Sequence, residues 1–126
     1  MNKNIHILAA GYYFEAAEDF DRKRNIETDC ERKTALMIAA AQNYFYCIIN
    51  LIEAVLAEKL EEHSFNHENR LNKILDHRNL FSETVIQQYS AVDRNLRNKV
   101  TYRGENGKKY EAIKELARLL KNEKQI

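Results

Sequence analysis

The chain has 126 residues, of which 20 are Lys or Arg, 19 are Asp or Glu, three are Gly and none is Pro. This length fits one domain, so we expect residues 1–126 to form a single unit. The balanced charge excludes a polycation that coats nucleic acid with its whole surface, and the scarcity of Pro and Gly indicates a nearly all-helical chain. Cys30 and Cys47 are too few for a disulfide framework, and no signal peptide opens the sequence, so we expect a cytoplasmic protein with free thiols.

An apolar stripe predicts a first helix, because its members recur at spacings of three and four. The stripe consists of Ile5, Leu8, Tyr12, Ala16 and Phe20. A basic patch at 22–25 follows, and Thr28 and Glu31 then have the spacing of a capping box that opens a second helix. The alternative is that residues 22–28 continue as one bent helix.

The second helix is long and mostly apolar between residues 35 and 57, which is the length of a membrane span. Its apolar side chains fall into two neighbouring stripes: Met37, Ala41, Tyr44, Ile48, Leu51 and Val55, then Ile38, Phe45, Ile49, Ile52 and Leu56. A third stripe is largely polar and contains Asn43, Tyr46, Asn50, Glu53 and Ala57. A carboxylate inside a membrane costs a few kcal/mol, so the pattern favours the central helix of a soluble bundle over a span.

Three further helices are predicted. Leu71, Ile74 and Leu75 mark a short third helix. Ser82 can open the fourth, whose stripe is Val85, Ile86, Tyr89, Val92, Leu96 and Val100 and whose end suits Gly104. A fifth carries Tyr110, Ile113, Leu116, Ala117 and Leu120. The sequence therefore predicts an all-α, up-and-down bundle of four to five helices.

Residues 43–56 resemble the second helix of HEPN domains, with tyrosines, then small residues, then a polar position before an Ala-Val-Leu end. His67 before a short helix, and Arg97-Asn98 closing the fourth helix, are similar to that family in order and spacing. The resemblance implies a HEPN-like bundle that forms a homodimer. It also implies kinship with metal-independent ribonucleases, including toxins encoded beside a nucleotidyltransferase-like antitoxin.

The active motif of that family is an arginine, a polar residue and, further on, a histidine. Arg97 matches the arginine and Asn98 the polar residue, whereas Tyr102 stands at the histidine position. Histidine, with a pKa near 6.5, can move protons at neutral pH, but tyrosine, near 10, stays a donor. On a regular helix Tyr102 lies roughly 140° from Arg97, so the two converge only if the helix frays or a dimer mate completes the site. The resemblance therefore implies a catalytic site built on Arg97, Asn98 and Tyr102, with weak or no catalysis.

Other residues near this motif are candidates for ligand binding. Six cations, Arg94, Arg97, Lys99, Arg103, Lys108 and Lys109, either hold a phosphate or are the solvated charges of a helix end. Among them, Lys99 and Arg103 flank the motif closely. Asn50 and Glu53 either face solvent or hold Arg97 across the second and fourth helices. No glycine-rich phosphate loop or zinc motif occurs in the sequence, so we expect no cofactor and no metal.

Two functional classes stay open. The first is a homodimer that binds RNA, a nucleotide or a protein, such as a nucleotidyltransferase-like antitoxin, at a cleft around Arg97. The second is a metal-independent endoribonuclease in which Tyr102, His67 or His77 replaces the missing histidine. Plain structural dimerisation is a third reading, which needs no site. Tyr102 stands where the family has the histidine that moves protons, and this difference favours the first class.

Overall fold

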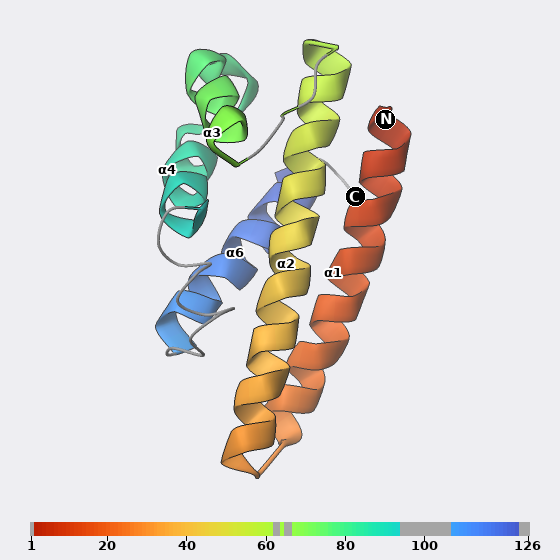
Figure 1. Ribbon diagram of the computed structural model, residues 1–126, viewed down its shortest axis with the longest axis vertical. Coiled ribbons are helices and arrows are strands. Elements are labelled where there is room, and N and C mark those ends of the chain that lie inside the picture. Colours follow the sequence, from red (N-terminus) through yellow and green to blue (C-terminus); the bar gives the residue numbers. More distant parts are fainter. Residues whose placement is uncertain (1, 62–63, 65–66, 94–106, 124–126) are drawn as a thin grey trace.

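The structure is a computed structural model that describes residues 2–61, 64, 67–93 and 107–123. Over these ranges the chain is helical and contains no β-strand (Figure 1). The helices are α1 (Lys3–Ile26), α2 (Cys30–Lys59), α3 (His67–Asp76), the short 3-10 helix η1 (Arg78–Leu80), α4 (Glu83–Ala91) and α6 (Gly107–Glu123). The prediction of an all-α helical bundle is therefore confirmed.

The two longest helices, α1 and α2, lie antiparallel along each other (Figure 1). A tight connection separates them, because Glu27 and Asp29 have extended backbone conformations. The alternative of one bent helix is therefore wrong. The predicted capping box is also wrong by one residue: Asp29, not Thr28, caps α2, and its carboxylate accepts a 2.9 Å hydrogen bond from the Arg32 amide. Aspartate serves as well as threonine as an N-cap acceptor, so spacing alone did not distinguish them.

The central helix is α2, as predicted. All members of its first apolar stripe are buried, and so are Phe45, Ile52 and Leu56 of the second. By length and composition α2 is also apolar enough to cross a membrane, with a mean hydropathy of 1.5 over its most apolar window. Half of that window is buried inside the bundle. These side chains form the main hydrophobic core with α6 and α4.

The first helix presents a different face to the core from the one its apolar stripe predicts. Three members of that stripe, Ile5, Leu8 and Tyr12, are exposed on the outside of the bundle. The buried positions are His6, Ala10, Ala17 and Asp21. The two small alanines lie against α2, and the two polar side chains find partners on other helices. The prediction that Ile5, Leu8 and Tyr12 pack inward is therefore wrong. The buried face of α1 is the one that carries small residues and polar side chains with partners on other helices.

The remaining helices cover the other side of α2. In Figure 1, α6 crosses behind α2 while α3 and α4 lie beside its C-terminal half. Ser82 caps α4 as predicted, accepting a 3.2 Å hydrogen bond from the Val85 amide. The predicted apolar residues of α6, Tyr110, Ile113, Leu116, Ala117 and Leu120, are all fully buried. The predicted positions Leu96, Val100 and Gly104 lie outside the described residues.

Candidate functional site

The residues predicted to carry chemistry divide into two groups. Five of them, Arg97, Asn98, Lys99, Tyr102 and Arg103, lie outside the described residues, so their predicted roles stay predictions. Asn50 and Glu53 are described, and both stand on α2. The fourth helix is followed closely by Asp93, which precedes Arg97 by four positions in the sequence.

Glu53 is a buried carboxylate with a cationic partner. Its Oε1 accepts a 2.9 Å hydrogen bond from Nε of Arg70 on α3, and its Oε2 accepts a 3.1 Å bond from the Ser64 amide. Both charged side chains are buried. A solvent-facing Glu53 is therefore excluded. The partner that the structure gives it is Arg70. Whether Glu53 also holds Arg97, as predicted, stays a prediction, because Arg97 lies outside the described residues.

Tyr89 on α4 extends this ion pair toward the end of that helix. Burial raises its pKa to about 12, with nearby Arg70 acting in the opposite direction and Asp93 adding to the rise. For Arg70, burial disfavours the charged guanidinium, but Tyr89 and Glu53 more than offset this, so the pKa of Arg70 is raised. Tyr89 therefore stays protonated and Arg70 charged at neutral pH.

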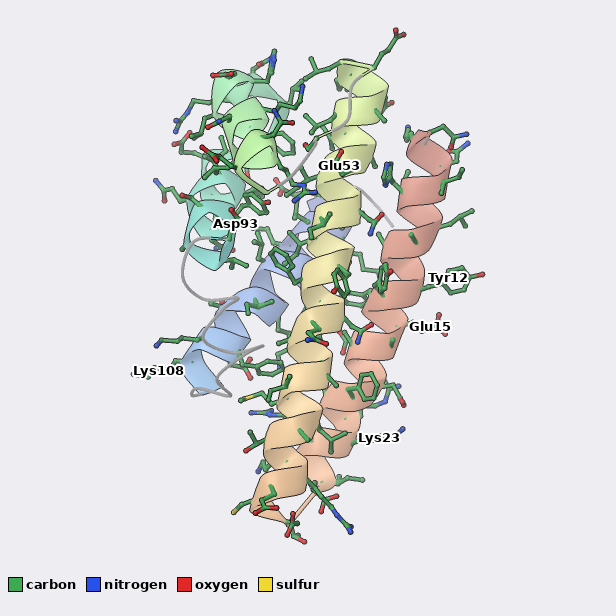
Figure 2. All side chains as sticks on the ribbon, viewed as in Figure 1. Tyr12, Glu15, Lys23, Glu53, Asp93 and Lys108 are labelled. Carbon is green, nitrogen blue, oxygen red and sulfur yellow. The ribbon has the colours of Figure 1, made fainter. Side chains whose placement is uncertain are left out.

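We call Glu53, Ser64, Arg70, Tyr89 and Asp93 the Glu53 cluster. Hydrogen bonds join its members on α2, on the connection after α2 and on α3, and the electrostatic influence of Arg70 and Asp93 on Tyr89 brings in α4. Figure 2 labels its two ends, Glu53 on α2 and Asp93 just after α4. Its hydrogen bonds fasten α3 and the connection before it to the central helix, and Tyr89 of α4 lies beside the buried Arg70.

Asn50 lies one turn before Glu53 but faces a different helix. Its Oδ1 is 3.0 Å from Nδ1 of His6 on α1, and its amide donates to the Tyr46 carbonyl at 2.9 Å. An amide oxygen only accepts, so this contact requires the His6 tautomer that carries a proton on Nδ1. The contacts of Asn50 thus link α1 to α2.

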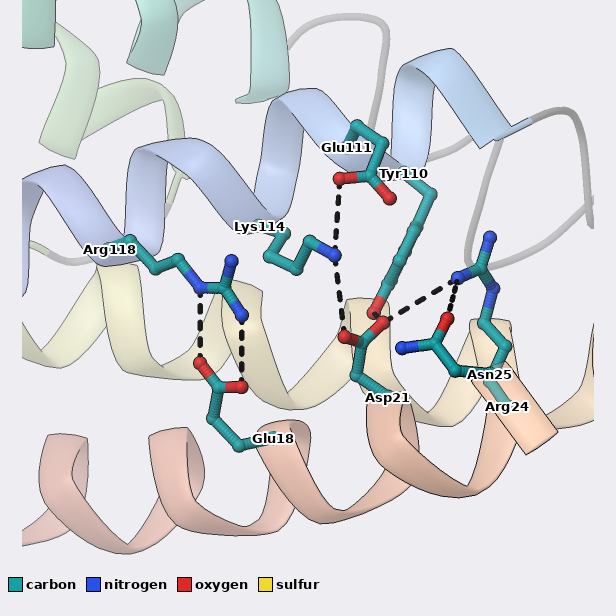
Figure 3. A network of polar contacts seen from close by, with 8 residues as sticks. All are labelled: Glu18, Asp21, Arg24, Asn25, Tyr110, Glu111, Lys114 and Arg118. Carbon is teal, nitrogen blue, oxygen red and sulfur yellow. Dashed lines mark hydrogen bonds and ion pairs between the residues drawn. The ribbon is translucent and has the colours of Figure 1, made fainter.

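A second buried polar cluster lies between α1 and α6 (Figure 3). The hydroxyl of Tyr110 donates a 2.5 Å hydrogen bond to Oδ1 of buried Asp21, and Nζ of Lys114 lies 3.3 Å from Oδ2. Arg24 approaches the same carboxylate at 3.6 Å and stacks over the Tyr110 ring at 4.7 Å. One turn away along both helices, Arg118 donates two hydrogen bonds to the Glu18 carboxylate, from Nε to Oε1 at 3.1 Å and from Nη2 to Oε2 at 3.0 Å.

These contacts determine the charge states in the second cluster. Burial alone would raise the pKa of Asp21, but the Tyr110 hydrogen bond and the Lys114 charge more than offset it, so the pKa is lowered. Burial, followed by the hydrogen bond to Asp21, raises the pKa of Tyr110 well above its ordinary value. Both oxygens of Asp21 are occupied by the chain's own groups. The arrangement therefore fastens α6 to α1 and leaves no carboxylate oxygen of Asp21 for a ligand.

Sequence reasoning missed both Asp21 and Arg70. One signal in the sequence could have indicated Asp21. Ala10 and Ala17 are seven residues apart on one face of α1, and Asp21 follows four residues later on the same face. For Arg70 no spacing rule pointed to Glu53, seventeen positions earlier. No three His, Cys, Asp or Glu side chains gather as metal ligands in the part of the chain that is described.

The fold and its two polar clusters define a class, an all-helical bundle with buried ion pairs between its helices. Comparisons of the chain with protein-family models, with curated proteins and with solved structures gave no match.

Proposed function

We propose that this chain is a homodimeric, HEPN-like helical module that binds RNA or a nucleotide through the basic segment around Arg97, with little or no catalysis. The observation that carries the proposal is the Glu53 cluster. Its buried pair of Glu53 and Arg70 lies beside Tyr89 on α4, and after this helix the chain continues toward Arg97, four residues beyond Asp93. Placing charged groups inside a bundle costs free energy, so we infer that this helix end needs a fixed position.

The sequence after that helix end supplies the ligand chemistry. Six cations lie between residues 94 and 109, against the acidic residues Asp93 and Glu105. Arginine forms paired hydrogen bonds with phosphate oxygens, so Arg97 is the residue we assign to the phosphate. A nucleotidyltransferase-like protein is the partner that the HEPN resemblance adds to this proposal.

The test is binding of a short fluorescent RNA at low salt, measured by anisotropy. Wild type should bind, and Arg97→Ala should weaken binding by roughly tenfold or more, as loss of one charge-assisted contact of about 1.5–3 kcal/mol implies. Lys33→Ala removes one exposed positive charge from the start of α2 and should have little effect. Equal binding by all three proteins would refute a phosphate site at Arg97.

The second candidate is a metal-independent endoribonuclease, and the Arg97-Asn98 match to the family motif favours it. Its test is cleavage of a mixed RNA pool in excess chelator. Cleavage that disappears in Arg97→Ala would establish this activity, and a further loss in Tyr102→Phe would assign a role to the phenol. Binding without cleavage is the result that the binding module predicts.

A further inference from the structure

The outward side of α1 carries a row of side chains that the bundle leaves uncovered. We call Tyr12, Glu15, Asp19, Lys23 and Ile26 the outer face of α1, which the exposed side chains of Ile5 and Leu8 continue toward the N-terminus of the helix. Tyr12 is 71% exposed and Ile26 is 82% exposed. At 100° per residue the five positions fall within an arc of roughly 80°. In Figure 2, Tyr12, Glu15 and Lys23 all project from the side of α1 that is turned away from α2.

The spacing of this row is the same in both directions from Asp19. The intervals between its members are three, four, four and three residues. When two copies of the helix pack antiparallel about a two-fold axis at Asp19, each residue lies opposite the residue of the other copy that is equally far from Asp19 on its other side. Tyr12 then lies opposite Ile26 of the other copy, and Glu15 lies opposite its Lys23. A two-fold interface requires this self-complementarity.

Charge within the row is also compatible with that packing. Lys23 and Arg22 lie 3.1 and 3.4 Å from the Asp19 carboxylate, so the two aspartates at the axis would each bring neutralising cations. Glu15 has no ion-pair partner among the residues that the structure describes. Lys23 is 58% exposed beside Asp19 of its own copy, so in this pairing its ammonium would lie between that aspartate and Glu15 of the second copy.

Two shallow grooves lie beside the row, the first along α1 from Ile7 to Arg22 and bordered by Lys121 of α6, the second at the end of α1. A groove of about 520 Å³ is lined by Leu8, Gly11, Tyr12 and Glu15, among others. A second groove of about 460 Å³ is lined by Lys23, Ile26, Ala35 and Leu36 with two neighbours. Residues 12 and 26 lie about 21 Å apart along the helix, so a two-fold at Asp19 places Ile26 of each copy near Tyr12 of the other.

We propose that the outer face of α1 is the contact surface between two copies of this chain, packed antiparallel about Asp19. This inference rests on the homodimer of the proposed function, for which it names the interface. The contact is confined to about four turns of one helix, which is small beside the roughly 20–30 residues per partner of a standard stable interface. We therefore expect a dissociation constant in the micromolar range.

Charge reversal tests this pairing directly. Glu15→Lys and Lys23→Glu should each raise the dimer dissociation constant roughly tenfold, because each acts twice in a symmetric dimer. The double variant Glu15→Lys/Lys23→Glu restores both contacts and should return the constant close to the wild-type value. Glu68→Lys makes the same charge change at an exposed position of α3 and is the matched control. Sedimentation velocity across the micromolar range measures all four variants, with circular dichroism confirming their helix content.

The outcomes separate this interface from the proposed function. A wild-type protein that stays monomeric at high micromolar concentration overturns both the interface and the homodimer. A dimer that neither single reversal weakens overturns this interface and leaves a homodimer formed elsewhere. Rescue by the double variant, with RNA binding at low salt measured separately, supports the interface whether or not Arg97 binds phosphate.

Cross-linking gives an independent measurement. In a Cys30→Ser background, Asp19→Cys places one thiol beside the axis, where its counterpart in the second copy lies opposite. Mild oxidation should produce a covalent dimer quickly, whereas Glu68→Cys in the same background should react slowly. Equal rates for the two positions would overturn the proposed packing.

Discussion

Oε1 of Glu53 on α2 lies 2.9 Å from Nε of Arg70 on α3, and both side chains are buried. This ion pair joins the central helix to α3 across an interior from which water is largely excluded. Its contribution is asymmetric: replacing both partners with apolar residues can be nearly neutral, whereas removing one leaves a buried, unpaired charge.

Arg70→Met should therefore destabilise the protein by about 3 to 5 kcal/mol, because Glu53 stays buried without its cation. The double variant Glu53→Leu/Arg70→Met should recover most of that loss. Urea unfolding followed by circular dichroism measures both. A loss below about 1 kcal/mol for Arg70→Met would mean that Glu53 can reach solvent or another cation.

The second cluster predicts acid sensitivity. The pKa of Asp21 is lowered in the folded protein, so its contribution to the free energy of unfolding is fully present above the unfolded value of about 3.9. That contribution is lost as the pH falls through the lower folded pKa. Asp21→Asn should flatten the dependence of stability on pH below about pH 4, measured by urea unfolding at several pH values. An unchanged slope would contradict the assignment.

Tyr110→Phe tests the same cluster without removing a charge. It deletes the hydroxyl that donates the 2.5 Å hydrogen bond to Asp21 while keeping the buried ring. Loss of a hydrogen bond to a buried charged group should cost about 1 to 3 kcal/mol. Thermal unfolding at pH 7 measures the change, and a wild-type melting temperature would show that Lys114 and Arg24 suffice for Asp21.

The two cysteines should react very differently with thiol reagents. Cys30 is exposed at the start of α2, whereas burial raises the pKa of Cys47 to about 12. Only the thiolate reacts, so one thiol per chain should be labelled in native protein and two in denaturant. Cys30→Ser should abolish the native reaction. Rapid native labelling of that variant would indicate that α2 opens around Cys47.

Much of the fold was predictable because α2, α4 and α6 follow a simple rule. Their apolar stripes, such as Val85, Ile86 and Tyr89 on α4, are the faces that pack. On α1 the rule failed, since Ile5 and Tyr12 are exposed while His6 and Asp21 are buried. Hydrophobic periodicity considers only apolar residues. It therefore cannot predict that a polar residue is buried against a partner on a distant helix.

The candidate site was predictable only in part for the same reason. The polar stripe on α2 indicated that Glu53 would need a partner, but its pairing with Arg70 depends on how the chain folds back after α2. Asn50, one turn earlier, pairs instead with His6 at the start of the chain. Sequence spacing places side chains on one face of a helix, and packing decides which helix that face meets.

The measurement that tests the central claim most directly is the salt dependence of RNA binding, comparing wild type with Arg97→Ala. A phosphate site predicts that log K falls linearly with log salt, and that Arg97→Ala reduces the slope by about 0.7, the value for one contact to a single strand. An identical slope in the two proteins, or no binding at low salt by folded wild type, would contradict a phosphate-binding role for Arg97.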